Sequence, residues 1–286
     1  MKDLQIIFRR YYDFYRSKCP HYEQFEICNN PNGCSCKIIS EVWSYIRSIL
    51  PDEFVDLTIY DFKGATSLRD CEELLDDKTK VGIDKMVVSA RNKVWEYCWK
   101  KPFVDGLSPQ EMDLISVIDH RFSAGTNMVI HGTHYYNVYD AEKNKQKRIA
   151  LQKGKSMLSS IVLKEAIRRK MFATNKASTF GYISFPVLQN NFIDYKDEDK
   201  QEHVSDWEER DWLVIDDISY DNFEASSRIR SNVKQALNSF LMRRLEKQKP
   251  TIFVFQFNID DCDISEQFGP VLDKIISSKS TFVVQV

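Results

Sequence analysis

The sequence predicts an α/β protein in which a parallel five-stranded sheet is flanked by helices. From about residue 127 onward, short apolar runs alternate with long amphipathic stretches, and this alternation is typical of βαβ units. The chain has 286 residues, 43% of them apolar, which is enough for one large core and a small appendage.

The predicted core elements follow one another in a regular order. The run NMVIHG is the first strand, and the amphipathic stretch SMLSSIVLKEAIRRKMFA is the helix after it. The other strands are TFGYISFPVL, DWLVIDDIS, TIFVFQFNI and TFVVQV, and a long helix lies near Glu224 to Lys247. Upstream, helices are predicted at Lys85 to Lys100 and at Glu111 to Phe122.

Two polar insertions interrupt this order. Residues 133–153, THYYNVYDAEKNKQKRIALQK, are expected to form an exposed excursion, and Asp194 to Asp211 an acidic loop. Both are too polar for us to assign secondary structure.

Residues 1–46 are predicted to form a small module ahead of the core at residues 47–286. This stretch is rich in cysteine and aromatic residues, carries the turn run NNPNG, and ends in the helical-looking segment KIISEVWSYIRSI.

The charge of the chain limits the classes of partner. A formal net charge of -2 argues against binding nucleic acid over the whole surface, although a local basic patch is compatible with it. No apolar run approaches the length of a bilayer span, and the N-terminus MKDLQIIFRRYYDFYR lacks the apolar segment of a signal peptide. We therefore expect a cytoplasmic protein without a membrane partner.

A split phosphate-binding loop is predicted between the first strand and its helix. The motif GxxxxGK[ST] needs a glycine after a strand, and a second glycine, a lysine and a hydroxyl residue before a helix. Gly132 ends the strand, and Gly154, Lys155 and Ser156 begin the helix, but 21 residues separate the two glycines instead of four. The helix N-terminus and Lys155 suit phosphates, and Ser156 suits magnesium. Because GKS also arises by chance, other motifs have to support the site.

Carboxylates and an amide supply that support. Asp216 and Asp217 end the apolar run WLVIDD; such a strand delivers the first acid to a metal and the second toward an attacking water. Asn258 follows the strand IFVFQF, and ligands of open parallel sheets lie at the carboxyl ends of strands. We interpret Asn258 as a sensor of the γ-phosphate.

The order of these motifs resembles the AAA+ ATPases of the DnaC, DnaI and IstB group, the bacterial and phage helicase loaders and transposition ATPases. Similar segments, from Leu50 onward, are LPDEFVDLTIYDF, FGYISF, the Walker B text LVIDDIS, the Pro-Thr-Ile run before the sensor strand and FGPVLDKIISSKSTFVVQV. The resemblance implies a P-loop NTPase fold of the AAA+ (ASCE) type without a C-terminal helical lid.

The resemblance also implies a residue that acts on a neighbouring subunit. The group places an arginine finger where this chain has Lys274, which lacks the guanidinium fork. The resemblance therefore does not decide whether this residue promotes ATP hydrolysis on a neighbouring subunit. The alternative donors are Arg228, Arg230, Arg243 and Arg244.

Loaders that resemble DnaI carry a zinc module ahead of the core, and this implies zinc at Cys19, Cys28, Cys34 and Cys36. Four thiolates suit tetrahedral zinc, although the Cys34-Ser35-Cys36 spacing is tighter than a common knuckle and His21 is an alternative ligand. The other interpretation is a set of buried or surface thiols. In the family the module contacts the replicative helicase.

The sequence thus predicts an ATP-binding, helicase loader-like protein of DNA replication. ATP and magnesium would bind through Gly132, Gly154, Lys155, Ser156 and Asp216, with Asp217, Asn258 and Lys274 serving hydrolysis. Nucleotide state would control assembly with a hexameric replicative helicase, the grip on single-stranded DNA and formation of a homo-oligomer. The alternatives are an IstB-like transposition ATPase and an AAA+ adaptor that binds without hydrolysing.

The first insertion is compatible with two interpretations, and contact with single-stranded DNA is one of them. Residues 143–155 carry six basic residues and no acid, just after three tyrosines: Lys143, Lys145, Lys147, Arg148, Lys153 and Lys155, after Tyr135, Tyr136 and Tyr139. Basic residues beside aromatic ones follow a backbone and stack on bases. The alternative interpretation is a solvated insertion whose charge serves solubility.

Overall fold

The structure, a computed structural model, describes residues 44–55, 57–59, 61–62, 77–104, 107, 109–132, 135–140, 145–150, 154–173, 178–193, 198–219 and 227–286. Cys19, Cys28, Cys34, Cys36 and His21 lie outside these residues, so the zinc module stays a prediction. Within the described ranges, no helix combines the length and apolarity that crossing a bilayer requires.

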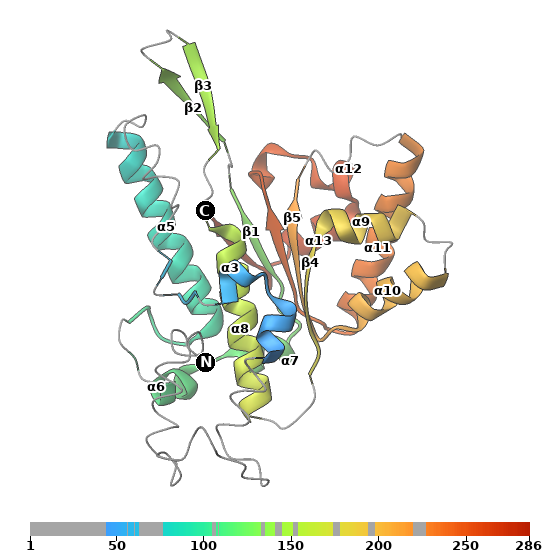
Figure 1. The fold of residues 1–286 in the computed structure, drawn as a ribbon, viewed down its shortest axis with the longest axis horizontal. Coiled ribbons are helices and arrows are strands. Elements are labelled where there is room, and N and C mark those ends of the chain that lie inside the picture. Colours follow the sequence, from blue (N-terminus) through green and yellow to red (C-terminus); the bar gives the residue numbers. More distant parts are fainter. Residues whose placement is uncertain are drawn as a thin grey trace.

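Five parallel strands form one sheet in the order β4-β5-β6-β1-β7 (Figure 1). Their bounds are Met128–His131 for β1, Phe180–Ser184 for β4, Trp212–Ile218 for β5, Thr251–Phe255 for β6 and Phe282–Gln285 for β7. Each neighbouring pair is parallel, which confirms the predicted sheet. β1 lies between β6 and β7, and β6 separates it from β5.

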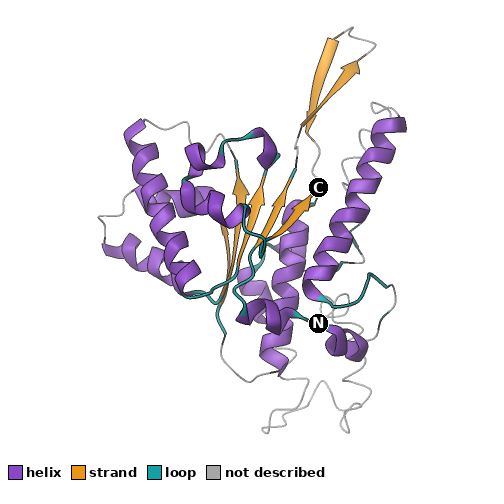
Figure 2. Cartoon of the chain, turned by 180° about the vertical axis from the view of Figure 1, so that it is seen from behind, coloured by secondary structure: helices purple, strands orange, loops and turns teal. Residues whose placement is uncertain are grey.

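Helices cover both faces of this sheet (Figures 1 and 2). One face packs against α5 (Asp77–Cys98), α7 (Ile118–Ser123) and α8 (Lys155–Ala173). The other packs against α9 (Phe185–Ile193), α11 (Ser227–Glu246), α12 (Ile264–Phe268) and α13 (Pro270–Ile276). The flanking helices that the sequence predicts are therefore present.

Alternate residues of the central strands belong to two separate hydrophobic cores. Trp212 and Val214 of β5 pack on the α8 face, whereas Leu213 and Ile215 pack on the α11 face. Because both faces of a covered parallel sheet are buried, such strands read as continuous apolar runs. This is why the strands could be recognised in the sequence.

The insertion between β1 and α8 contains a β-hairpin, which corrects the expectation of an excursion without secondary structure. β2 (Tyr135–Asp140) and β3 (Lys145–Ala150) pair antiparallel, and they stand apart from the five-stranded sheet (Figure 1). A local antiparallel ladder satisfies backbone donors and acceptors even where the composition is polar. Polarity alone was therefore a poor guide.

A helix, α10 (Glu198–Glu209), occupies most of the segment expected to be an acidic loop. Val204 and Glu208 are buried and Trp207 is half-buried, so one face of α10 is covered. Val204 and Trp207 belong to the core that includes α9 and α11. With only these two apolar residues, the segment shows too little helical periodicity of hydrophobic residues for the helix to be predicted.

The remaining predicted elements are present with shifted bounds. The helix predicted at Glu111 to Phe122 divides into α6 (Pro109–Ile115) and α7, because Ser116 forms a bridge with Trp99 between them. α11 matches the predicted long helix, and the FPVL sequence begins α9 instead of extending β4. Residues 44–49 are helical, and α3 (Asp52–Val55) follows them.

Candidate functional site at the carboxyl edge of the sheet

The sheet brings three of the predicted motifs to one edge. β1, β5 and β6 are parallel, so Gly132, the pair Asp216-Asp217 and Asn258 all lie at the carboxyl ends of their strands. Open parallel sheets bind ligands at this edge. The predicted common location of these motifs follows from the topology.

Gly132 occupies a position that only glycine fits. Its φ is 149°, and its amide donates to the Phe257 carbonyl over 3.1 Å. A Cβ at this position would lie 1.9 Å from the carbonyl oxygen of Val286, which no real contact allows. The backbone that leaves β1 is thus held between the segment after β6 and the end of β7.

Lys155 connects the two halves of the split loop by a hydrogen bond. Its ammonium group donates to the Gly132 carbonyl over 2.9 Å, and the side chain is 4% exposed. Tyr135 and Ala150 are paired at the base of the hairpin, so the chain leaves and re-enters the loop at adjacent points. Without the hairpin, five residues would separate Gly132 from Gly154, two before the hairpin and three after it. The motif has four residues between its two glycines, so this spacing is close to it.

Gly154 begins α8 in a conformation that also favours glycine. Its φ is 76°, and a Cβ there would lie 2.7 Å from the Phe62 ring. The buried Phe62 therefore packs on the turn that starts the helix. Ser156 lies in the first turn of α8 and is partly exposed.

The two aspartates lie in an irregular part of β5. The pairing of β5 with β6 shifts register between Ile215 and Ile218, and Asp217 has a φ of 59°. Such bulges re-aim side chains and are frequent beside active sites. Asp216 is buried, whereas Asp217 is exposed.

Asp216 lies on the face of the sheet that α8 covers. It has the same parity along β5 as Trp212 and Val214, which pack on that face, and it pairs in register with Ser184. One carboxylate oxygen accepts from the amide of Asp217 over 2.7 Å, and the other accepts from the Tyr182 hydroxyl. Its orientation is therefore set from two sides.

Tyr182 connects the carboxylate to the helix after the phosphate loop. Burial and the Asp216 carboxylate raise the pKa of Tyr182, and a bond with Ser159 opposes this shift. Ser159 lies one turn after Ser156, and its hydroxyl donates to the Ser156 carbonyl over 2.9 Å. Tyr182 thus joins β4, β5 and α8.

The electrostatics of Asp217 differ from those of an ordinary surface carboxyl. Desolvation raises the pKa of Asp217, and the adjacent Asp216 carboxylate raises it further. The left-handed backbone adds a conformational cost, although aspartate tolerates it better than most residues. Unfavourable charge and backbone together mark a candidate functional position.

Asn258 and His131 form the third corner of the site. The Asn258 side chain accepts from the Asp260 amide and bonds to His131, and the His131 Nδ1 accepts from the Ile259 amide over 3.4 Å. Burial lowers the pKa of His131, and the positive charge of Lys155 lowers it further. The Asp260 carboxylate and the hydrogen bond with Asn258 raise this pKa, but the net shift is downward. The phosphate loop and the sensor segment are therefore linked through a neutral imidazole.

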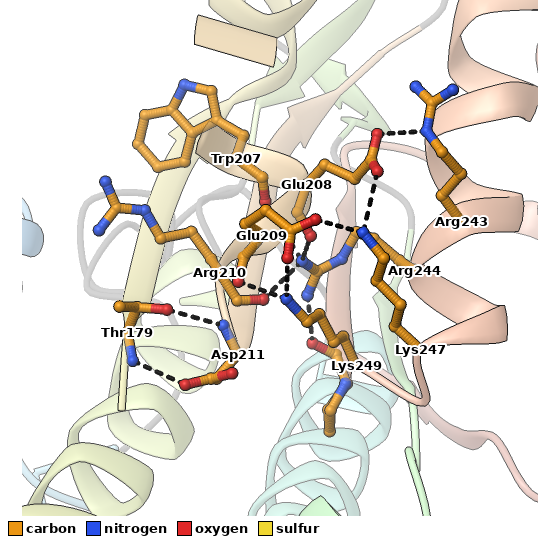
Figure 3. Close-up of polar contacts among 11 residues, drawn as sticks. Thr179, Trp207, Glu208, Glu209, Arg210, Asp211, Arg243, Arg244, Lys247 and Lys249 are labelled. Carbon is orange, nitrogen blue, oxygen red and sulfur yellow. Dashed lines mark hydrogen bonds and ion pairs between the residues drawn. The ribbon is translucent and has the colours of Figure 1, made fainter. Parts of the chain in front are cut away.

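Lys274 and the alternative arginines lie elsewhere in the fold. Lys274 is exposed on α13, on the face of the sheet opposite α8. Arg244 is 1% exposed and donates to the carbonyls of Trp207, Glu208 and Arg210 (Figure 3). It also donates to the Pro250 carbonyl and the Thr251 hydroxyl. Arg243 pairs with Glu208, and Arg228 and Arg230 lie near the start of α11. Because its guanidinium is engaged inside the chain, Arg244 is unsuited to act on another subunit.

Three side chains were not predicted as part of the site. Tyr182 and Phe62 reach it only through tertiary packing, and the register of β4 against β5 that brings Tyr182 to Asp216 is not visible in the sequence. His131 directly precedes Gly132, and this position is a sequence signal for the site. The signal is weak, because many polar residues at strand ends have no functional role. In the described part of the chain, no cluster of three or more His, Cys, Asp or Glu side chains forms a metal site.

Comparisons with known proteins return structures and no sequence family. No protein-family model and no curated protein matches the sequence. One similar solved structure is DnaI, with 17% identity and a TM-score of 0.39 over 64% of this chain and 87% of that one. A second is the DnaC helicase loader, with 14% identity and a TM-score of 0.39 over 67% of this chain and 98% of that one. A third is the replication initiator DnaA bound to AMPPCP and single-stranded DNA, with 13% identity and a TM-score of 0.40 over 67% of this chain and 50% of that one. DnaI and DnaC belong to the group that the motifs resemble. At these TM-scores, all below 0.5, the matches carry no inference about function.

Proposed function

We propose that this chain is an ATP-binding AAA+ protein of the helicase-loader type that acts in DNA replication. The observation that carries the proposal is the hydrogen bond from Lys155 to Gly132, which joins the two halves of a phosphate loop across an inserted hairpin. Asp216 and Asn258 lie at the same edge of the sheet. A lysine, a metal-binding carboxylate and a polar sensor in this order are the set that nucleoside triphosphates require.

The side chains present fit ATP and magnesium. Lys155 would neutralise the β- and γ-phosphates, and the first amides of α8 would donate to them. Ser156 and Asp216 would hold magnesium, since hydroxyl and carboxylate oxygens are its preferred protein ligands. Bound Mg-ATP would supply a phosphoanhydride bond that can be hydrolysed, with the negative charge of its phosphates partly neutralised by magnesium and Lys155. The Tyr182 hydroxyl would keep the Asp216 carboxylate in place.

Asp217, Asn258 and Lys274 are the proposed hydrolytic residues. Asp217 is exposed beside Asp216, where a carboxylate with a raised pKa would orient and deprotonate water. Asn258 would sense the γ-phosphate and transmit its presence through His131. Lys274 would act on the site of a neighbouring subunit, because its side chain is exposed to solvent.

A second candidate is an adaptor that binds ATP without turnover. The lysine at position 274 and the hairpin inside the phosphate loop favour it, because both depart from a fast AAA+ ATPase. Release of inorganic phosphate by the purified chain, measured with and without single-stranded DNA, separates the two candidates.

The proposed partners follow from the same assignment. Nucleotide state would control assembly with a hexameric replicative helicase, self-association and the grip on single-stranded DNA. The cysteines at positions 19, 28, 34 and 36 would hold zinc and dock the helicase; metal analysis of the purified chain checks the zinc. Capture of a transposase in place of a helicase would select the IstB-like alternative.

The test of ATP binding uses two buried lysines of the same helix. Lys155→Met removes the ammonium group at the phosphate loop, and we expect at least a tenfold loss of ATP affinity, since a charged hydrogen bond contributes about 1.5–3 kcal/mol. Lys164→Met is the matched control. Lys164 is also buried on α8 and donates to main-chain carbonyls, those of Phe54, Val55 and Leu57, away from the loop.

Isothermal titration with Mg-ATP, at a temperature where both variants are folded, gives the comparison. Lys164→Met should lower stability and keep the ATP affinity. Equal ATP affinities for Lys155→Met and the unmodified chain would sink the proposal.

A further inference from the structure

His131 is a buried polar side chain at the end of β1, between the phosphate loop and the segment after β6. It is 3% exposed and directly precedes Gly132. Its backbone is fixed by the sheet, because it pairs in register with Gln285 of β7 and its carbonyl accepts from the Val286 amide over 2.8 Å. A buried imidazole needs hydrogen-bond partners, and this ring finds them in the segment that begins with Asn258.

The partner of one ring nitrogen fixes the tautomer of His131. The Ile259 amide can only donate, and it donates to Nδ1 over 3.4 Å. Burial and the positive charge of Lys155 lower the pKa of the ring, so the ring is neutral at pH 7. A neutral imidazole carries one proton, and with Nδ1 as the acceptor this proton lies on Nε2. His131 is therefore a donor through Nε2.

Asn258 receives hydrogen bonds on its oxygen. It is the N-cap of the short 3-10 helix η4 (Ile259–Asp261), and its Oδ1 accepts from the Asp260 amide over 3.4 Å. Its bond with His131 raises the pKa of the imidazole, as expected where the ring donates. Two donors thus face the oxygen of the amide. The Nδ2 group, at the other end of the same planar amide, is directed away from them.

The orientation of this amide decides whether Asn258 suits a phosphate. The oxygens of a charged phosphate accept hydrogen bonds, so a sensor must present N–H groups, and asparagine has them only on Nδ2. An amide turned over about its Cβ–Cγ bond would present its oxygen to the anion and repel it. Asn258 is half-buried at the carboxyl edge of the sheet, where the γ-phosphate of the proposed nucleotide would lie.

We propose that His131 is a positioning residue, which holds the Asn258 amide with its N–H donors toward the γ-phosphate and thereby makes the site prefer ATP to ADP. This inference rests on the proposed function, because it takes Asn258 as the γ-phosphate sensor. It goes further in assigning the nucleotide preference to a side chain that acts on the sensor and not on the nucleotide.

The charged groups around His131 keep this donor pattern in place. Lys155 of α8 and Lys93 of α5 lower the pKa of the ring, whereas Asp260 of η4 raises it. In a charged imidazolium both nitrogens carry protons, so Nδ1–H would face the Ile259 amide and two donors would meet. The neutral ring is the form that fits the sensor segment.

The first test compares the ATP and ADP affinities of the full-length chain by isothermal titration in excess magnesium. His131→Phe keeps a ring in the buried site and removes both polar nitrogens. We expect ATP affinity to fall by about tenfold, the effect of one hydrogen bond to a charged group, and ADP affinity to change by less than about twofold. Equal losses for the two nucleotides would overturn the inference, because a general loss of structure weakens both.

Asn127→Leu is the matched control. Asn127 is 7% exposed and directly precedes β1, and its Oδ1 accepts from the Thr251 amide over 2.9 Å. Like His131, it is a buried side chain that accepts from a backbone amide beside β6, but it lies at the amino end of the sheet. The control should lower Tm and keep the preference for ATP. An equal loss of preference in the two variants would contradict a positioning role.

A double-variant cycle tests whether His131 acts through Asn258. Asn258→Ala removes the proposed sensor, and we expect the same loss of ATP preference as in His131→Phe. The double variant should lose no more than either single variant, because the two residues act as one unit. Losses that multiply would show that His131 acts independently of Asn258.

His131→Gln separates the two bonds of the ring. A glutamine amide nitrogen takes the place of Nε2 as a donor to Asn258, but this variant lacks the Nδ1 acceptor of the Ile259 amide. We expect it to restore most of the ATP preference that His131→Phe loses, at a lower Tm than the unmodified chain. A preference as low as in His131→Phe would contradict the donor role of Nε2.

The tautomer is measured directly in the unmodified chain, which keeps the inference testable if the variants fail to fold. Histidine labelled with nitrogen-15 is observed by NMR at pH 7, and the signals of His131 are identified by replacing each of the other histidines in turn. We expect a neutral ring with its proton on Nε2, whose signal shifts with Mg-ATP and not with Mg-ADP. A proton on Nδ1 would overturn the inference.

The two proposals fail in different ways. If the unmodified chain binds no ATP, the proposed function fails. If it binds ATP, and Asn258→Ala loses the preference over ADP while His131→Phe keeps it, only the role of His131 is overturned.

Discussion

Asp216 and Asp217 are neighbours in the sequence but differ in environment. Asp216 is buried and accepts two hydrogen bonds, whereas Asp217 is exposed, has a left-handed backbone and a raised pKa. In a regular strand Asp217 would lie on the buried face that α11 covers, but the register shift in β5 and the left-handed backbone of Asp217 accompany a side chain that is exposed instead. These two environments suit the proposed roles, a metal ligand for the first acid and a base for the second.

Tyr182→Phe tests whether the tyrosine positions the Asp216 carboxylate for the proposed magnesium ion. Loss of the hydroxyl leaves one oxygen of Asp216 without its donor, and we expect the magnesium concentration needed for ATP binding to rise by about tenfold. Tyr45→Phe is the control, because its hydroxyl accepts from the Phe180 amide at the other end of β4. A magnesium requirement that rises equally in both variants would contradict a positioning role.

Asp217→Asn tests the electrostatic cost of the second acid. A carboxyl group whose pKa is higher in the folded state stabilises the fold when protonated, and this contribution is lost as pH rises through the folded pKa. The charged form is therefore unfavourable at pH 7. We expect Asp217→Asn to raise Tm at pH 7 by on the order of 2 °C, since an exposed group contributes less than about 1 kcal/mol.

This gain should shrink as pH falls through the folded pKa and vanish below about 4, where the carboxyl is protonated in both states. Asp84→Asn, at an exposed position on α5, serves as the reference. A gain that is the same at every pH would show that the backbone conformation, and not charge, is responsible.

At the scale of elements, α10 depends on a residue distant in sequence. Arg244 of α11 donates to the carbonyls of Trp207, Glu208 and Arg210 at the end of α10, and thereby caps it (Figure 3). Burial lowers the pKa of Arg244 to about 9, so the group stays charged at neutral pH. A helix with a weak apolar face is held by this non-local cap.

Arg244→Met should destabilise the protein by about 3 kcal/mol or more, because it leaves several buried carbonyls without donors. Arg243→Met, which breaks a half-exposed ion pair with Glu208, should cost less than about 1 kcal/mol. Urea unfolding gives both values, and hydrogen exchange should report faster opening of α10 only in the first variant. Similar losses in the two variants would argue against the cap.

The phosphate loop shows how far the sequence could be interpreted. The strand before Gly132 and the helix after Lys155 are predicted by local apolar patterns, and the structure contains both. The hairpin between them was not predicted, because a ladder of backbone hydrogen bonds needs no apolar side chains. Asp216 was predicted from its strand, but Tyr182 depends on a register that no local pattern contains.

For the whole molecule, local residue patterns are sufficient to predict the covered parallel sheet and the order of the motifs along it. Strands buried on both faces must be continuously apolar, and glycine, lysine and aspartate at strand ends are visible without a fold. Three contacts became visible only in the folded chain: Lys155 bonds to Gly132 across the inserted hairpin, Tyr182 bonds to Asp216, and Arg244 is buried in the chain's own interior. They could not be predicted because they join residues from different elements, and their energies depend on packing and register instead of local periodicity.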